Sequence, residues 1–358
     1  MIKKFWKNKK VLIIGHTGFK GGWLTIILSL FGAKVYGIAL KPETKPNFFN
    51  LVNLKKYLVK DLRINIENYK TLNKEIKKIK PLIIFHLAAQ SKVRDSYTSS
   101  LDTIKTNILG TTNVLEIFRN YPFINSLLIT TTDKVYKNIN NKRSFTEKDE
   151  LGGDDIYSAS KSAVEIIANA YNKSFFIKSK KKSIICLRAG NAIGGGDWTK
   201  DRIIPDCIKA IDNKKQIIIR NPKSIRPWQH VLEPLFGYII IAENTFKNKN
   251  KSDIAFNFGP RISNCVNVKT LSELLIKSLR IKKKIIYKKS RDNFYEKKYL
   301  LLNSKKVNQK IKWASKFNME ETVRLTADWY REYFNKNNLE DKTISQVSYY
   351  LNKYYEKK

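Results

Sequence analysis

The stretch Val11-Leu-Ile-Ile-Gly15-His-Thr-Gly18-Phe-Lys-Gly21 decides the fold. It begins with a short apolar run, passes through a turn with three glycines and continues into the amphipathic segment 22–31. Glycines at such a turn let the backbone approach a pyrophosphate closely, and the N-terminus of the following helix favours its negative charge. Because strand, turn and helix follow one another in the required order, the stretch predicts a dinucleotide-binding unit.

Apolar runs and longer amphipathic segments alternate through the first half of the chain. Strand–helix alternation of this kind predicts a parallel sheet with helices on both faces. Continuous apolar strands fit burial from both sides. We therefore predict an α/β fold, a Rossmann-like doubly wound parallel sheet with a smaller C-terminal substrate-binding domain. The expected strands are 11–14, 34–40, 82–87, 127–131 and 184–188, and the expected helices are 22–31, 72–80 and 103–119.

After about Asn191 the pattern becomes irregular, with glycines at 194–196 and several prolines. Long loops with unusual residues often carry binding groups. We therefore assign residues 1–190 to a dinucleotide-binding domain, to which the chain returns near 226–260, and residues 191–358 mainly to substrate binding.

Three elements are expected within this second part. Residues 217–220 and 239–242 are predicted to be short elements, and 319–334 a helix. Trp329 and Tyr330 on that helix are expected to pack in the core.

The chain has 358 residues and a formal net charge of +38. A large positive charge can indicate binding to nucleic acid or to a membrane surface. Here the lysines are spread along the whole chain and no nucleic-acid motif accompanies them, so we interpret the charge as compositional bias and expect neither partner. An anionic substrate would still benefit from this field. No apolar run approaches the roughly 20 residues that cross a bilayer.

The cysteines, Cys186, Cys207 and Cys265, are isolated and lack CxxC spacing. This argues against a disulfide framework or a zinc site and predicts a reducing, cytoplasmic location. The three histidines are far apart in the sequence, so no metal centre is expected.

The acidic residue that usually binds the adenosine ribose about 20 positions after the glycine turn is missing. The second strand ends at Leu40-Lys41, and the next acidic residue is Glu43. Spacing alone leaves NAD and NADP open, since Lys41 would suit a 2′-phosphate. Asp61, followed by Leu62, is either a loop residue that meets the adenine or a surface charge.

Tyr157 and Lys161 lie four positions apart at the start of a predicted helix and share one of its faces. An ammonium beside a phenol lowers the pKa of the phenol toward working pH. The pair therefore predicts a general base that removes a proton from a substrate hydroxyl.

With His86-Leu-Ala-Ala-Gln90 and Asn107, these motifs resemble the extended short-chain dehydrogenase/reductase family of NAD-dependent epimerases and dehydratases, over nearly the whole chain. Within that family the sequence is most similar to the CDP-glucose 4,6-dehydratases. The stretches that carry this similarity are 15–23, 132–136, 188–198 and, above all, Arg226-Pro-Trp-Gln-His-Val-Leu-Glu-Pro234. Relatives that act on other nucleotide sugars usually carry Asp-Glu where this chain has Asp133-Lys134.

The resemblance implies NAD as the cofactor and CDP-glucose as the substrate. Tyr157, helped by Lys161 and Thr132, would remove the C4 hydroxyl proton while the C4 hydride passes to NAD. Water would then leave across C5–C6, and the hydride would return to C6. We assign Asp133 to protonate the departing C6 hydroxyl and Lys134 to act as the base at C5. The alternative for Lys134 is a salt bridge at the strand end.

The resemblance also implies the binding residues and the assembly. The cofactor contacts implied are Gly15, Thr17, Gly18, Phe19, Lys20, Gly21, Asp61, Leu62, Leu87, Ala88, Ala89, Gln90, Asn107, Tyr157 and Lys161. The substrate contacts implied are Gln90, Arg94, Asn191, Arg202, Arg220 and Arg226. Arginine can chelate phosphate oxygens through two bonds, although each of these arginines could instead be solvated or ion-paired. The family implies a homodimer, or a higher homo-oligomer, that packs through 103–119 and the helix with Tyr157.

Two alternatives remain from the sequence. The chain could be another nucleotide-sugar dehydratase or a 4-epimerase, but an epimerase needs no acid and base for water elimination, so Asp133-Lys134 weighs against it. It could also bind nucleotide or nucleic acid without turnover, and the intact Thr132, Tyr157 and Lys161 weigh against that.

Overall fold

The structure is a computed structural model that describes residues 2–138, 143–179, 181–247, 254–288 and 299–356. Its centre is a seven-stranded sheet with the order β11-β7-β5-β4-β1-β2-β3. The strands are β1 (Lys10–Ile14), β2 (Lys34–Ala39), β3 (Lys60–Arg63), β4 (Ile83–His86), β5 (Ser126–Thr130), β7 (Ser183–Ala189) and β11 (Ala255–Phe258). Each pair of neighbouring strands runs parallel, and the order reverses beside β1. The predicted doubly wound fold is confirmed.

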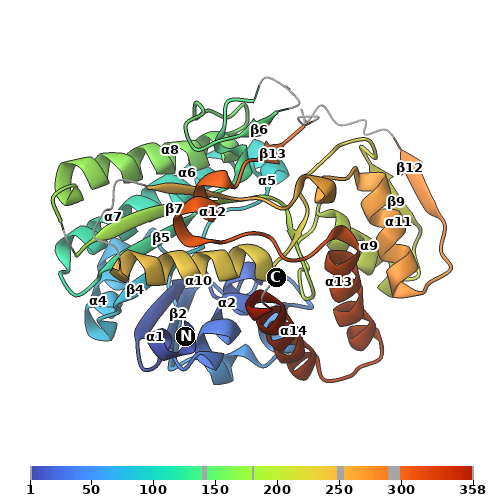
Figure 1. The fold of residues 1–358 in the computed structure, drawn as a ribbon, viewed down its shortest axis with the longest axis horizontal. Coiled ribbons are helices and arrows are strands. Elements are labelled where there is room, and N and C mark those ends of the chain that lie inside the picture. Colours follow the sequence, from blue (N-terminus) through green and yellow to red (C-terminus); the bar gives the residue numbers. More distant parts are fainter. Residues whose placement is uncertain (1, 139–142, 180, 248–253, 289–298, 357–358) are drawn as a thin grey trace.

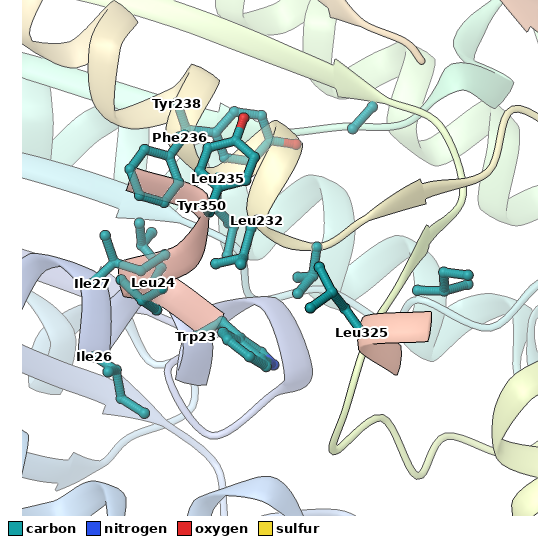
Figure 2. Packing of buried hydrophobic residues seen from close by; sticks show 14 of the residues in the cluster. Trp23, Leu24, Ile26, Ile27, Leu232, Leu235, Phe236, Tyr238, Leu325 and Tyr350 are labelled. Atoms are coloured by element: carbon teal, nitrogen blue, oxygen red, sulfur yellow. The ribbon is translucent and has the colours of Figure 1, made fainter. Parts of the chain in front are cut away.

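Residues of β1 alternate between two apolar clusters, one on each face of the sheet. Val11 and Ile13 pack in the cluster that contains α2 (Phe19–Leu30) and α10 (Leu232–Lys247). Leu12 and Ile14 pack in the cluster that contains α4 (Tyr69–Ile79), α7 (Gly110–Asn120) and α8 (Ile156–Tyr171). Figure 2 shows Trp23, Leu24 and Ile27 of α2 beside Leu232 and Phe236 of α10. Burial on both faces explains why the central strands are continuously apolar.

The five strands expected from the sequence are all present, with ends that differ by a few residues. The expected helices 22–31 and 72–80 correspond to α2 and α4. The expected helix 103–119 is divided into α6 (Ser100–Ile104), a π-helical turn η2 (Lys105–Leu109) and α7. Strands β3 and β11 were not predicted, because both are short strands at the edges of the sheet and β3 is mostly charged.

Elements of the C-terminal part gather beyond one end of the sheet, at the right of Figure 1. They include α9 (Ile203–Asp212), α11 (Val268–Leu279), α13 (Met319–Phe334) and the parallel pair of β9 (Ile217–Arg220) and β12 (Ile285–Lys288). α14 (Leu339–Tyr355) packs against α13. The predicted strand-length element 217–220 and helix 319–334 are confirmed, as is the full burial of Trp329 and Tyr330.

The prediction of a separate short element at 239–242 is wrong. These residues belong to the long helix α10, which continues through a run that is buried from Leu235 to Ile239 and so lacks the polar breaks that end an element.

Short elements complete the described chain. The helical ones are α1 (Ile2–Trp6), α3 (Phe48–Leu51), η1 (Leu54–Tyr57), α5 (Val93–Thr98), η3 (Asp133–Val135), η4 (Asn172–Phe176), η5 (Ile262–Asn264) and α12 (Lys305–Ile311). Two small parallel pairs join β8 (Ala192–Ile193) to β10 (Gln229–His230) and β6 (Ser144–Phe145) to β13 (Leu301–Leu302). In the part of the chain that the structure describes, no helix is long and apolar enough to span a membrane.

Candidate active site

The glycine turn between β1 and α2 has the shape that a pyrophosphate needs. Gly15 has a φ of +100°, and a Cβ there would lie 2.6 Å from the amide nitrogen of Ala88. A Cβ at Gly21 would lie 2.1 Å from the carbonyl oxygen of Gly15. A Cβ at Gly18 would meet nothing closer than 3.5 Å, so the backbone there is open to a ligand. These residues fit a dinucleotide, because the open turn lies at the N-terminus of α2.

Asp61 lies on β3 beside this turn and is held by two side chains. The ring Nε2 of His16 is 2.7 Å from Oδ1 of Asp61, and Nη2 of Arg63 donates to Oδ2 at 2.9 Å. The Arg63 guanidinium lies 5.1 Å from the ring centre of Phe49. Asp61 is therefore a paired, mostly buried carboxylate and not a solvated surface charge. His16 was not predicted as a site residue, although it lies in the glycine turn, and its imidazole packs against Gly37 of β2.

The other predicted residues of the cofactor half lie around the same edge of the sheet. Thr17 Oγ1 donates to the carbonyl of Leu40, at the end of β2, at 3.1 Å. The loop after β4 carries Leu87, Ala88, Ala89 and Gln90.

Asn107 joins that loop to the helix with Tyr157. Its Oδ1 accepts from the backbone N–H of Gln90 at 2.9 Å, and its Nδ2 donates to Ser160 Oγ at 2.9 Å. Ser160 Oγ in turn donates to the carbonyl of Tyr157 at 2.7 Å. The side chain of Gln90 is engaged with the backbone of Lys92 and does not line the cavity described below.

Tyr157 is a buried phenol beside Thr132. Burial raises the pKa of Tyr157 to about 12, while a hydrogen bond with Thr132 and the charge of Arg202 act to lower it. The expected net lowering by Lys161 is wrong for this structure. Lys161 donates from Nζ to the carbonyl of Thr130 at 3.1 Å, and burial lowers its own pKa to about 8. Burial therefore raises the pKa of Tyr157 by more than the neighbouring groups lower it.

Asp133 is an almost fully buried carboxyl group next to Thr132. Its Oδ1 accepts from Thr132 Oγ1 at 3.0 Å, whereas Oδ2 has no hydrogen-bond partner among the described residues. Burial raises the pKa of Asp133, and the neighbouring positive charge of Lys134 opposes this rise. A carboxyl group in this setting can hold a proton and give it to a leaving oxygen.

These groups open into one cavity of about 320 Å³. It is lined by Thr132, Asp133, Lys134 and Tyr157, and by five of the six residues predicted to bind substrate: Arg94, Asn191, Arg202, Arg220 and Arg226. Lys20 also lines it, although the sequence placed this residue with the cofactor alone. Burial lowers the pKa of Lys20 to about 8.

The arginines of the cavity are paired with aspartates that the sequence analysis did not select. Arg202 Nη1 donates to Asp197 at 3.0 Å, and Arg220 Nη2 donates to Asp201 at 2.8 Å. Arg94 lies 3.8 Å from the same oxygen of Asp201. Asp197 stands in the quoted stretch 188–198, so its place in a conspicuous motif was the available signal. The structure therefore shows Arg94, Arg202 and Arg220 as ion-paired residues that line the cavity, and their contact with substrate stays a prediction.

Arg226 is a buried arginine that has a hydrogen bond to the backbone. Its Nη1 donates to the carbonyl of Ile225 at 2.8 Å.

Asp206 on α9 also lines the cavity. Burial and the nearby Asp201 raise the pKa of Asp206 to about 6.

Comparisons with known proteins agree with this architecture. The family model described as GDP-mannose 4,6 dehydratase matches residues 12–326. CDP-glucose 4,6-dehydratase of Salmonella typhimurium is 37% identical over 335 residues, which cover 92% of this chain and 93% of that protein. The dTDP-D-glucose 4,6-dehydratase of Dictyostelium discoideum is 32% identical, over 65% of this chain and 55% of that protein.

Among solved structures, the dTDP-glucose 4,6-dehydratase of Bacillus anthracis, in complex with NAD, aligns with a TM-score of 0.75 at 22% identity. The alignment covers 92% of this chain and 98% of that one and shows the shared fold. The resemblance to the extended short-chain dehydrogenases/reductases is confirmed. With its doubly wound sheet, its glycine turn and the match across residues 12–326, the chain belongs to the GDP-mannose 4,6 dehydratase family.

Proposed function

We propose that this chain is a hydro-lyase that converts CDP-glucose to CDP-4-dehydro-6-deoxyglucose with NAD. The observation that carries the proposal is the presence of Tyr157, Thr132, Asp133 and Lys134 in one cavity whose rim is rich in arginine. The Salmonella relative, which is similar over nearly its whole length, supports the choice of cytidine. The Asp133-Lys134 pair supports dehydration over epimerisation, because only dehydration needs an acid and a base for loss of water.

The chain offers a complete set of residues for NAD. Gly15, Gly18 and the N-terminus of α2 would hold the pyrophosphate, and Asp61 would meet the adenine. Tyr157 and Lys161 would lie at the nicotinamide end. When bound there, NAD supplies a reversible acceptor for the hydride of a sugar carbon.

Tyr157 accepts the proton of the sugar C4 hydroxyl in this proposal. A phenol whose pKa lies near 12 is protonated at neutral pH, so the groups that favour its ionised form matter. Thr132 does so through its hydrogen bond, and Arg202 does so through its charge. Both therefore assist Tyr157 directly.

Asp133 and Lys134 perform the elimination. The buried carboxyl of Asp133 holds the proton that the departing C6 hydroxyl needs. Lys134 takes the proton from C5, which the neighbouring ketone has made acidic. An amine is a base only when it is neutral, which burial or nearby positive charge favours.

Arg94, Arg202, Arg220 and Arg226 bind the diphosphate and the nucleoside. Their guanidinium groups face one cavity and match the geometry of phosphate oxygens. Residues 1–190, with the return near 226–260, form the cofactor domain, and 191–358 form mainly the substrate domain. Because α10 and β11 pack with the sheet while α9 and β9 reach the cavity, the contacts support this division.

We also propose a homodimer in the cytoplasm. The helices α6, η2 and α8 each carry an apolar side chain that is more than half exposed. These are Leu101 (60%), Leu109 (51%) and Ile166 (59%). Two copies that pair these helices would bury this face. Light scattering should give the mass of a dimer for the native chain and of a monomer for Ile166→Glu. A monomeric native chain would contradict the dimer.

The three unpaired cysteines support the proposed location in the cytoplasm, because the cytoplasm is a reducing compartment in which thiols stay reduced.

The experiment that tests the function is turnover of CDP-, dTDP-, UDP- and GDP-glucose by the purified chain with NAD. The expected result is a 4-keto-6-deoxy product, lighter by one water, from CDP-glucose alone. Conversion of a different nucleotide sugar would keep the reaction and overturn the cytidine assignment. No conversion of any of them would overturn the dehydratase proposal.

A further inference from the structure

A buried ion pair lies directly behind the catalytic cluster. Arg188 on β7 and Glu165 on α8 have side chains that are 4% and 2% exposed. Arg188 Nε donates to both carboxylate oxygens of Glu165, at 3.0 and 2.9 Å. Neither residue lines the cavity. Removing two charges from water costs so much free energy that such a pair is a weak source of stability compared with apolar side chains. The pair therefore calls for another role.

Two residues tie the segment with Thr132, Asp133 and Lys134 to this pair. At its start, Thr131 Oγ1 donates to Glu165 Oε1 at 2.5 Å. At its end, the hydroxyl of Tyr136 accepts from Arg188 Nη1 at 2.7 Å and donates to Asn257 Oδ1 at 2.6 Å. The Arg188 guanidinium also lies 4.8 Å from the ring centre of Tyr136.

The same pair is fixed to the helix that carries the other catalytic residues. Glu165 lies one turn after Lys161 on α8, on the same face of the helix. Next to Lys161, Ser162 Oγ donates to the carbonyl of Val135 at 2.9 Å. The helix and the segment after β5 are thus joined at three points through buried polar groups.

We propose that Glu165, Arg188 and Tyr136 form a positioning unit that holds Asp133 and Lys134 in place relative to Tyr157 and Lys161. This rests on the proposed function, in which Tyr157 and Lys161 serve the oxidation at C4 while Asp133 and Lys134 serve the loss of water. The bidentate pairing of Arg188 fixes direction as well as distance, which apolar packing would not do. The unit keeps the groups for the two half-reactions around one sugar ring.

Tyr136→Phe tests the unit, because it removes the hydroxyl and keeps the ring that packs on Arg188 and on Phe145. Small displacements of a catalytic group lower rates by about 100-fold. We expect elimination to fall by about 10- to 100-fold and C4 oxidation, for which the same segment supplies only Thr132, to fall much less. In a single turnover with CDP-glucose, reduced nicotinamide should then accumulate, and solvent deuterium should enter C5 more slowly than in the native enzyme.

A second pair of variants tests the other tie. Thr131→Val should likewise slow elimination more than C4 oxidation. Thr131→Ser, which keeps a hydroxyl, should have the native ratio of the two rates. Tyr350→Phe is the matched control, because its buried hydroxyl also serves a carboxylate, donating to Glu233 at 2.7 Å, far along the chain from the segment. Oxidation and elimination that fall together in Tyr136→Phe, or an equal imbalance in Tyr350→Phe, would overturn the positioning role.

Hydrogen exchange gives a readout that does not depend on turnover. The amides of 131–136 should exchange faster in Tyr136→Phe than in the native chain, while those of the helix α8 keep their protection. Unchanged exchange in 131–136 would overturn the inference even if the native chain failed to dehydrate any nucleotide sugar. Such a failure by itself would overturn only the proposed function.

Discussion

Trp23 and Gly195 connect the cofactor helix to the substrate loop. The indole Nε1 of Trp23, on α2, donates to the carbonyl of Gly195 at 3.0 Å in the buried core. The ring of Trp23 stacks on Phe48, and Phe48 stacks on Trp329 of α13. Helices from the two ends of the chain therefore share one aromatic cluster.

This contact predicts the effect of Trp23→Phe. The variant loses a buried hydrogen bond and leaves space beside Phe48, so the free energy of unfolding should fall by about 2–4 kcal/mol. The Michaelis constants for NAD and for the nucleotide sugar should rise together. Urea unfolding and initial rates would measure both, and an increase in only one of the two constants would argue against the shared support.

Gly15→Ala should abolish cofactor binding and destabilise the fold. The new Cβ would meet Ala88 at 2.6 Å, and the φ of +100° is strained for alanine. Gly18→Ala should weaken NAD binding without destabilising the fold, because its Cβ would meet no protein atom closer than 3.5 Å but would stand where the pyrophosphate binds. Calorimetric titration with NAD should show weaker binding in both variants, and thermal unfolding should show a lower melting temperature only in Gly15→Ala. An equal loss of melting temperature in both variants would contradict this account of the turn.

Arg202→Gln should shift the pH profile of the reaction to higher pH. The positive charge of Arg202 lowers the pKa of Tyr157, so its removal raises that pKa further. Because the base acts in its ionised form, the pH at which kcat/KM rises should move upward, by contrast with Arg202→Lys. An unchanged profile with an altered KM would assign Arg202 to substrate binding alone.

Lys134→Ala should leave oxidation at C4 in place and stop the loss of water. Removal of a positioned general base costs about 10²- to 10⁴-fold. The measurement is loss of water from a pre-formed 4-keto substrate, with Lys137→Ala, a solvent-exposed neighbour, as the control. Full elimination by Lys134→Ala would show that another group is the base.

Sequence patterns predicted the parts of the molecule that depend on local chemistry. Glycines in a turn after β1, apolar runs in buried strands and the start of a helix near Tyr157 each have a local physical cause, and each lies where the sequence pattern predicts it. The edge strand β3 was not predicted because Leu62 is its only apolar residue, and β11 was not predicted because its buried run is only four residues long.

Features that arise from tertiary approach could not be read in this way. Asp201 lies 19 positions from Arg220 along the chain, and Asp61 lies 45 from His16. The sign of the pKa shift of Tyr157 depends on its burial in the folded protein, which the spacing to Lys161 does not report. Charges and motifs gave the candidates, and only the fold gave their partners.

The pairing of Arg94 and Arg220 with Asp201 has a consequence for ligand choice. An anion that enters the cavity must take these arginines from a carboxylate that they already neutralise. A ligand with little charge gains too little from that exchange, whereas a diphosphate can contact several guanidinium groups at once. Asp201 thus competes with the ligand for Arg94 and Arg220. An uncharged free sugar would not displace Asp201 from these arginines, whereas a diphosphate would.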